Sequence, residues 1–204
     1  MTCLLLVDLQ NDFMPGGALA VPLGNEVIGT ANRLAADFDY VVASQDWHPS
    51  DHRSFASQHP GREPGDVIDL AGIEQVLWPD HCLQGSFGSE FHADLDRGQV
   101  DAVFRKGTDP QLDSYSAFFD NARRRSTGLL EHLATRAVKD LWLLGLASDY
   151  CVKFSALDAV SVGLRTHVVE DGCRGIDLSP GDVARAWDEM RAAGVEIVSE
   201  ASVR

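Results

Sequence analysis

The chain has 204 residues, of which 45% are hydrophobic, enough for one well-buried core, and we predict a single domain over residues 1–204. Its formal charge of −14, from 31 acidic and 17 basic residues, would repel a phosphate backbone and argues against nucleic-acid binding. The apolar start of the chain stops at Asp8, too early for a signal peptide, and no stretch approaches the roughly 18 apolar residues of a membrane span.

Short apolar runs alternate with helical patterns along the chain. Strands are predicted at Cys3–Asp8, Tyr40–Ser44, Val100–Arg105, Asp140–Leu146, Thr166–Val169 and Glu196–Val198. Helices are predicted at about 25–36, 127–137, 150–162 and 179–193, the last with Ser179 as its N-cap. This alternation predicts an α/β fold, a doubly wound open sheet of about six mainly parallel strands flanked by helices. A long stretch rich in Pro, Gly and His, from about Asp46 to Arg97, is predicted to be a functional loop.

Four of the apolar runs lead into residues that can do chemistry. The first ends at Asp8, the second at Asp46-Trp47-His48, the third at Arg105-Lys106, and the fourth continues through a short turn to Cys151. In an open α/β sheet the ligand binds in the crevice at the carboxyl ends of the strands. The sequence therefore predicts that these residues meet in one active site.

Cys151 is the candidate nucleophile. It lies where a predicted strand turns into a helix, whose N-terminal N–H groups and dipole would stabilise a thiolate and could hold the oxyanion of an acyl-transfer intermediate. The other cysteines, Cys3, Cys82 and Cys173, are interpreted as structural, although Cys173 follows a strand and could approach the site. Widely spaced cysteines are typical of free thiols in a reducing compartment, so we expect a cytoplasmic protein.

Asp8 and Lys106 are the candidate partners of the thiol. A thiol needs a base and an amine leaving group needs an acid, and Asp8 could serve both needs in turn. Lys106 would keep that carboxylate charged and stabilise negative charge in the transition state. Either residue alone would be interpreted as a solvated charge at a strand end, so the hypothesis depends on their joint placement. The histidines within predicted elements, His132 and His167, are interpreted as structural.

A metal site is predicted beside these residues. Asp46 and His48 are two positions apart in an extended segment, so their side chains face the same way, and His81 follows in the long loop. One carboxylate with two imidazoles is a plausible ligand set for a divalent cation with open positions. His52 could add a ligand or support the site from outside. The spacing is a weak motif and does not separate zinc from iron.

Several segments of the chain resemble the nicotinamidases, which belong to the isochorismatase-like cysteine hydrolase superfamily. The matching segments are Asp8-Leu9-Gln10-Asn11-Asp12-Phe13, Pro15-Gly16-Gly17-Ala18-Leu19, Ser44-Gln45-Asp46-Trp47-His48-Pro49, Asp51-His52, Ser54-Phe55-Ala56, Leu77-Trp78-Pro79-Asp80-His81-Cys82, Phe104-Arg105-Lys106-Gly107 and Gly145-Leu146-Ala147-Ser148-Asp149-Tyr150-Cys151-Val152. The Asp/Lys/Cys set marks the superfamily, and the two metal-loop segments mark the nicotinamidases within it.

The resemblance implies a role for each of the matching residues. It assigns a catalytic triad of Asp8, Lys106 and Cys151. It assigns a divalent metal ion, zinc as first choice and iron or manganese as alternatives, to Asp46, His48 and His81. It implies a cis peptide before Ser148, an oxyanion hole from the backbone N–H groups of Ala147 and Cys151, and a pyridine ring held between Phe13 and Trp78. Tyr115 and Tyr150 would line the pocket, and Ser148 is counted among the substrate-binding and oxyanion residues. His52 is a metal ligand in some relatives only and is left out of this set.

The implied activity is hydrolysis of nicotinamide to nicotinate and ammonia through a thioester, as a step of NAD salvage, with pyrazinamide as a second candidate substrate. Two alternatives remain open at this point: a related cysteine amidohydrolase acting on another amide or an N-carbamoyl substrate, and a non-catalytic binding or scaffold protein that keeps the fold. Neither a G-x-G-x-x-G motif nor a P-loop follows the first strand, which argues against a nucleotide site. Association into a homo-oligomer is also left open.

Overall fold

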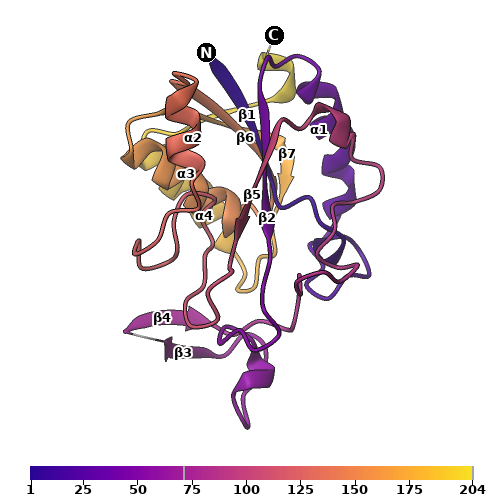
Figure 1. The fold of residues 1–204 in the computed structure, drawn as a ribbon, viewed down its shortest axis with the longest axis vertical. Helices are drawn as coiled ribbons and strands as arrows, with labels where there is room; N and C mark the ends of the chain where they lie inside the picture. The colour runs from indigo at the N-terminus through magenta and orange to yellow at the C-terminus, as the bar shows by residue number, and fades with distance from the viewer. Residues whose placement is uncertain (71, 204) are drawn as a thin grey trace.

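A six-stranded parallel sheet forms the centre of the protein in the computed structural model, which describes residues 1–70 and 72–203 (Figure 1). The strands are β1 Thr2–Val7, β2 Val41–Asp46, β5 Ala102–Lys106, β6 Asp140–Leu146, β7 Arg165–Arg174 and β8 Glu196–Val198, in the order β5-β2-β1-β6-β7-β8. Every pairing in this sheet is parallel, so the predicted doubly wound α/β fold is confirmed.

Helices cover both faces of the sheet and bury its central strands. The α-helices are α1 Val27–Ala35, α2 Leu129–Thr135, α3 Cys151–Ser161 and α4 Asp182–Ala192. Figure 1 shows α1 on one face and the other three on the opposite face. The prediction of Ser179 as the N-cap of α4 is wrong: the cap position is Gly181, in a left-handed conformation, and the Ser179 N–H instead donates to the Asp182 carboxylate at 2.7 Å.

The chain reverses direction across the sheet between β1 and β6. From β1 it winds outward through β2 and β5, and then returns to the other side of β1 to form β6, β7 and β8. A topological switch of this kind opens a crevice at the carboxyl ends of the two central strands. Strands β1 and β6 can stay close up to that point because residue 145 of β6 is glycine. Its φ is +134°, and a Cβ at this position would lie 2.2 Å from the Val7 carbonyl oxygen.

The long loop after β2 contains an element that the sequence interpretation missed. Strands β3 (Val67–Leu70) and β4 (Ile73–Val76) form an antiparallel hairpin, which lies beyond the carboxyl ends of the main sheet (Figure 1). Its strands are only four residues long and lie in a loop stretch rich in Pro, Gly and His, so their short apolar patches did not stand out as strands. The expectation of a loop without regular structure is corrected accordingly.

Helices in the described part of the chain are short. The longest, α3 and α4, have 11 residues each, and no helix there is long and apolar enough to cross a membrane.

Candidate active site and metal centre

Lys106 lies at the centre of the crevice and is fully buried among acceptors. Its Nζ is 2.9 Å from an Asp8 oxygen, 2.9 Å from Asp46 Oδ1, 3.1 Å from the Ser114 carbonyl and 3.4 Å from Cys151 Sγ. Burial alone would lower the pKa of this amine, but the Asp46 and Asp8 carboxylates raise it well above its ordinary value. The ammonium is therefore the charge that allows two carboxylates and a thiol to share one buried site.

Asp8 lies directly after β1 and has no exposed surface. Its Oδ1 accepts a hydrogen bond from Ser44 Oγ at 2.7 Å, and Lys106 holds the other oxygen. Burial raises the pKa of this carboxyl, and Lys106 and Ser44 offset only part of that increase. A carboxylate with a raised pKa is a stronger base than a solvated aspartate, which suits it to exchange protons with a thiol.

Cys151 is the first residue of α3 and is 7% exposed. As expected from the sequence, it lies at a helix N-terminus, but burial opposes the stabilisation of a thiolate there. Burial raises the pKa of Cys151 well above its ordinary value; Lys106 lowers it, but the Asp8 and Asp46 carboxylates add to the increase. A raised pKa favours the protonated thiol, and a thiol of this kind needs a neighbouring base to become a nucleophile.

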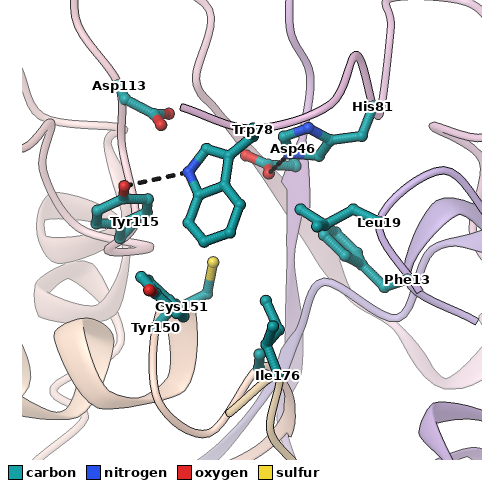
Figure 2. Close-up of a pocket in the computed structure, with 11 residues that line it drawn as sticks. Phe13, Leu19, Asp46, Trp78, His81, Asp113, Tyr115, Tyr150, Cys151 and Ile176 are labelled. Atoms are coloured by element: carbon teal, nitrogen blue, oxygen red, sulfur yellow. Dashed lines mark hydrogen bonds and ion pairs between the residues drawn. The ribbon is translucent and has the colours of Figure 1, made fainter. Parts of the chain in front are cut away.

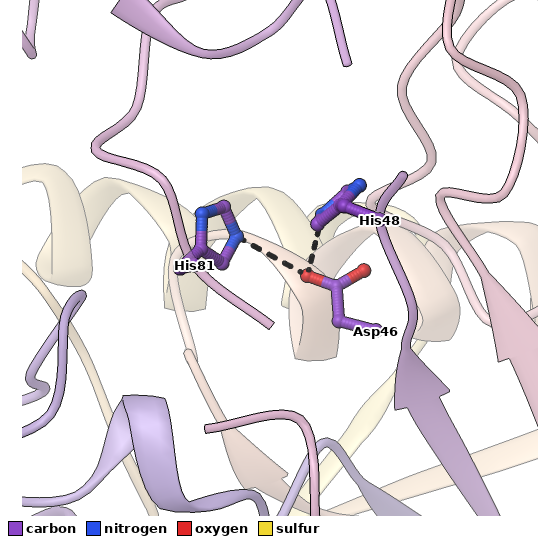
Figure 3. Close-up of side chains that lie close together, drawn as sticks. All are labelled: Asp46, His48 and His81. Atoms are coloured by element: carbon purple, nitrogen blue, oxygen red, sulfur yellow. Dashed lines mark ion pairs between the residues drawn. The ribbon is translucent and has the colours of Figure 1, made fainter. Parts of the chain in front are cut away.

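Three further predicted residues, Asp46, His48 and His81, converge on one point (Figure 3). Asp46 Oδ2 lies 3.2 Å from His48 Nε2 and 3.4 Å from His81 Nε2, and all three side chains are buried. The other ring nitrogen of each histidine faces a backbone carbonyl: His48 Nδ1 lies 3.0 Å from Gly107 O, and His81 Nδ1 lies 2.8 Å from Pro79 O. With each Nδ1–H donating to its carbonyl, the Nε2 lone pair of each ring would be free to bind a metal ion between the two histidines and the carboxylate.

This donor set fits a small divalent cation. Around a tetrahedral ion with ligand bonds of about 2.1 Å, ligand atoms lie roughly 3.4 Å apart, close to the observed spacings. A histidine that donates its second N–H to a carbonyl is the usual arrangement around bound metal. Burial pushes the pKa of Asp46 upward, but His48 and Lys106 hold it well below its ordinary value, so the carboxylate is available as a ligand.

His52 lies next to this site. Its Nδ1 is 2.7 Å from Ser54 Oγ, and its buried Nε2 has no hydrogen-bond partner among the described residues. Burial lowers the pKa of His52 to about 4, so the ring is neutral. With His48 and Asp113 it forms a second group whose potential ligand atoms lie within 4.8 Å of one another. Its contribution to metal binding stays a prediction.

A narrow pocket, with an accessible volume of about 20 Å³, lies between Cys151 and the candidate metal ligands Asp46 and His81 (Figure 2). Trp78 is fixed at its wall, since its Nε1 donates to Tyr115 Oη at 3.2 Å, and its ring meets Tyr150 edge-on at 4.8 Å between centroids. The structure brings most of the predicted pocket residues together here. The lining residues are Phe13, Leu19, Asp46, Trp78, His81, Asp113, Tyr115, Ala147, Tyr150, Cys151 and Ile176.

The turn before α3 presents two free backbone donors. These are the N–H groups of Ala147 and Cys151. Among the described residues, neither donates a hydrogen bond to a loop carbonyl or to a side chain. Ser148 is different: its N–H donates to Arg174 O at 2.8 Å, and it does not line the pocket. The cis peptide expected before Ser148 is one bond earlier, between Leu146 and Ala147.

Several residues of the site had no signal in the sequence interpretation. Asp113 and Ile176 line the pocket from loops without periodic patterns, and Leu19 was recognised only as part of a resembling segment. Ser44 contacts Asp8 and was recognised only as part of the resembling segment, although its position two residues before Asp46 places both side chains on one side of β2.

Comparison with known proteins places this geometry in a family. The Isochorismatase domain family matches residues 2–202, and the chain belongs to that family. It is 52% identical to a nicotinamidase of Escherichia coli over 198 residues, which cover 95% of this chain and 92% of the relative.

Two solved structures extend the comparison. An Acinetobacter baumanii nicotinamidase and pyrazinamidase superposes with a TM-score of 0.97 at 43% identity, over 100% of this chain and 98% of that one. A Pyrococcus horikoshii pyrazinamidase in complex with zinc superposes with a TM-score of 0.78 at 35% identity, over 97% of this chain and 98% of that one.

Proposed function

We propose that the protein is a metal-dependent nicotinamidase, a single-domain cysteine hydrolase that converts nicotinamide and water to nicotinate and ammonia. The observation that carries the proposal is the shared carboxylate of Asp46, which contacts Lys106 through one oxygen and the two histidines of the metal site through the other. One residue thereby joins a cysteine-hydrolase triad to a metal site in the wall of a small aromatic pocket. The high identity to nicotinamidases over nearly the whole chain supports the same substrate.

The catalytic steps follow from the placement of the three triad residues. Asp8 accepts the proton of the Cys151 thiol, and the sulfur attacks the carboxamide carbon. The free N–H groups of Ala147 and Cys151 are placed to stabilise the oxyanion, for which one donor contributes on the order of 3 kcal/mol. Asp8 then protonates the departing ammonia, a thioester remains on Cys151, and water deprotonated by Asp8 releases nicotinate. Throughout these steps the positive charge of the Lys106 ammonium compensates the negative charge of the site.

The pocket selects a flat aromatic amide. Phe13 and Trp78 are the side chains that we propose to enclose the pyridine ring, with Tyr115 and Tyr150 holding the indole in place. Asp46, His48 and His81 would hold the metal, for which zinc is the first choice. When bound, a divalent cation there supplies a Lewis-acidic point that orients the ring nitrogen of the substrate.

A related amidohydrolase acting on N-carbamoyl substrates is the competing function. The triad alone would serve it equally well, because the bond-breaking chemistry is the same. The buried Asp46/His48/His81 set and the aromatic wall favour the pyridine carboxamide, since a ureido group offers neither a ring to enclose nor a ring nitrogen to orient. We place the reaction in NAD salvage in the cytoplasm, and pyrazinamide is expected as a second substrate.

Ammonia release from nicotinamide and from an N-carbamoyl amine, measured on the same preparation, tests the proposal. We expect release from nicotinamide, loss of that activity after chelation, and recovery on adding zinc, iron or manganese. Ammonia from the carbamoyl compound alone would favour the competing function. No reaction with either substrate, together with iodoacetamide labelling of Cys151 that nicotinamide fails to block, would favour a protein without catalytic activity.

A further inference from the structure

Gln10 is a buried side chain whose hydrogen bonds all go to backbone groups around the metal centre. It has no exposed surface and lies two residues beyond Asp8. Its Oε1 accepts from the Asp46 N–H at 2.8 Å, and its Nε2 donates to the Asp46 carbonyl at 2.8 Å and to the Ser89 carbonyl at 2.9 Å. Both amide hydrogens and the amide oxygen are therefore used.

The position of Gln10 compensates for a break in the sheet. The ladder between β1 and β2 ends at the pair Leu6 and Ala43, and the chain then leaves the strand at Asp8, which has φ +50°. On its other side Asp46 continues to pair with Lys106 of β5. Without Gln10, the buried Asp46 N–H and carbonyl would have no hydrogen-bond partner among the described residues, which is unfavourable for both groups. The amide supplies the donor and the acceptor that a neighbouring strand would supply.

The Asp46 carboxylate depends on this backbone position. Its two oxygens are used in different directions, one toward Lys106 at 2.9 Å and one toward the metal-site histidines at 3.2 and 3.4 Å. A short side chain can serve both only if its Cα stays fixed. The third bond of Gln10 reaches Ser89 in the segment after His81, so the same amide also ties the second histidine loop to β2.

We propose that Gln10 is a positioning residue that sets the metal affinity of the protein by clamping the backbone of Asp46. The inference rests on the proposed metal-dependent function and adds a determinant outside the ligand set. Among the described residues, the side chain of Gln10 makes no hydrogen bond to a donor atom of the metal ligands and does not line the pocket; its hydrogen bonds go to the main chain of Asp46 and of Ser89.

Gln45 provides a matched control. It is 7% exposed, and its Nε2 donates to the same Ser89 carbonyl at 2.9 Å, while its Oε1 accepts from Arg105 at 3.2 Å. Its side chain makes no hydrogen bond to Asp46 among the described residues. Replacing either glutamine by methionine keeps a similar volume and removes a bond to Ser89, but only the change at Gln10 releases the Asp46 backbone.

Zinc affinity tests the proposal, measured on chelator-stripped wild type, Gln10→Met and Gln45→Met by competition with a chromophoric chelator. Thermal unfolding of the stripped proteins is measured in parallel. We expect Gln10→Met to bind zinc about 10- to 100-fold more weakly, the usual loss when a group that supports a ligand is removed, and Gln45→Met to bind as wild type does. Gln10→Glu keeps only the acceptor for the Asp46 N–H and is expected to weaken binding as well.

Four results would contradict this assignment or its basis. Wild-type zinc affinity in the Gln10 variants would overturn it. So would an equal loss of zinc affinity in Gln45→Met, because the shared hydrogen bond to Ser89 would then be what determines the affinity. A lower melting temperature without weaker zinc binding would reduce Gln10 to a structural role. If wild type itself binds no zinc, the proposed metal centre fails, and that outcome is distinct because it is seen before any variant is compared.

Discussion

Replacing Lys106 by methionine should destabilise the protein in a pH-dependent way. The change leaves the buried Asp8 and Asp46 carboxylates without the ammonium that lies 2.9 Å from each. Removing one partner of a buried ion pair costs about 3–5 kcal/mol. For a domain of this length each kcal/mol corresponds to about 2–4 °C, so we expect the melting temperature of chelator-treated protein to fall on the order of 10 °C at neutral pH.

The direction of the pH effect follows from Asp8. Burial already raises its pKa in the folded protein above the value of about 3.9 in an unfolded chain, and loss of Lys106 removes the main contribution that lowers it. A folded-state pKa above the unfolded value stabilises the fold at low pH, and that stability is lost as the pH rises through the folded pKa. The deficit of Lys106→Met relative to wild type should therefore shrink on acidification.

Thermal unfolding across a pH series checks this, with Lys153→Met as the matched control. Lys153 pairs with Glu189 at 3.0 Å near the surface, where an ion pair contributes less than about 1 kcal/mol. If Lys106→Met loses no more stability than Lys153→Met, or if its deficit is the same at every pH, the account of a charge-balanced buried site is wrong.

Three further changes test separate parts of the site. Ser44→Ala removes a hydrogen bond that lowers the pKa of Asp8, so the acid limb of the kcat/KM profile should move to higher pH; an unmoved limb would argue against Asp8 as the base. Tyr115→Phe removes the oxygen that accepts from two buried donors, and KM for nicotinamide should rise roughly fivefold with little change in kcat, for a loss of about 1 kcal/mol. Gly107→Ala places a Cβ 2.3 Å from His48 Cε1 at φ +65°, so metal content after dialysis should fall; full retention would contradict the assigned ligand.

The sequence predicted the sheet and the residues at its edge because buried parallel strands have a strong signal. Apolar runs ending at Asp8 and Lys106 can be recognised without a structure, and parallel order then brings their ends together. The proximity of the proposed metal ligands Asp46 and His48 followed from the alternation of side chains in an extended segment. Such features depend on local pattern and on one topological rule.

The remaining features depend on contacts between distant segments. Gln10 looks like an ordinary loop residue until the break in the β1–β2 ladder is known, and the Ser114 carbonyl at Lys106 belongs to a loop with no periodic pattern. The effect of burial on the pKa of Cys151 could not be predicted either, because the helix N-terminus is a local feature, whereas burial is a property of the whole fold.

Ammonia release from nicotinamide by Cys151→Ala, compared with wild type at matched zinc content, tests the central claim most directly. The substitution removes the nucleophile and leaves the metal ligands and the aromatic wall in place, so the variant should bind zinc and nicotinamide and release no ammonia above background. Substantial release by the zinc-loaded variant would mean that Cys151 does not form the thioester and that the reaction proceeds by another route.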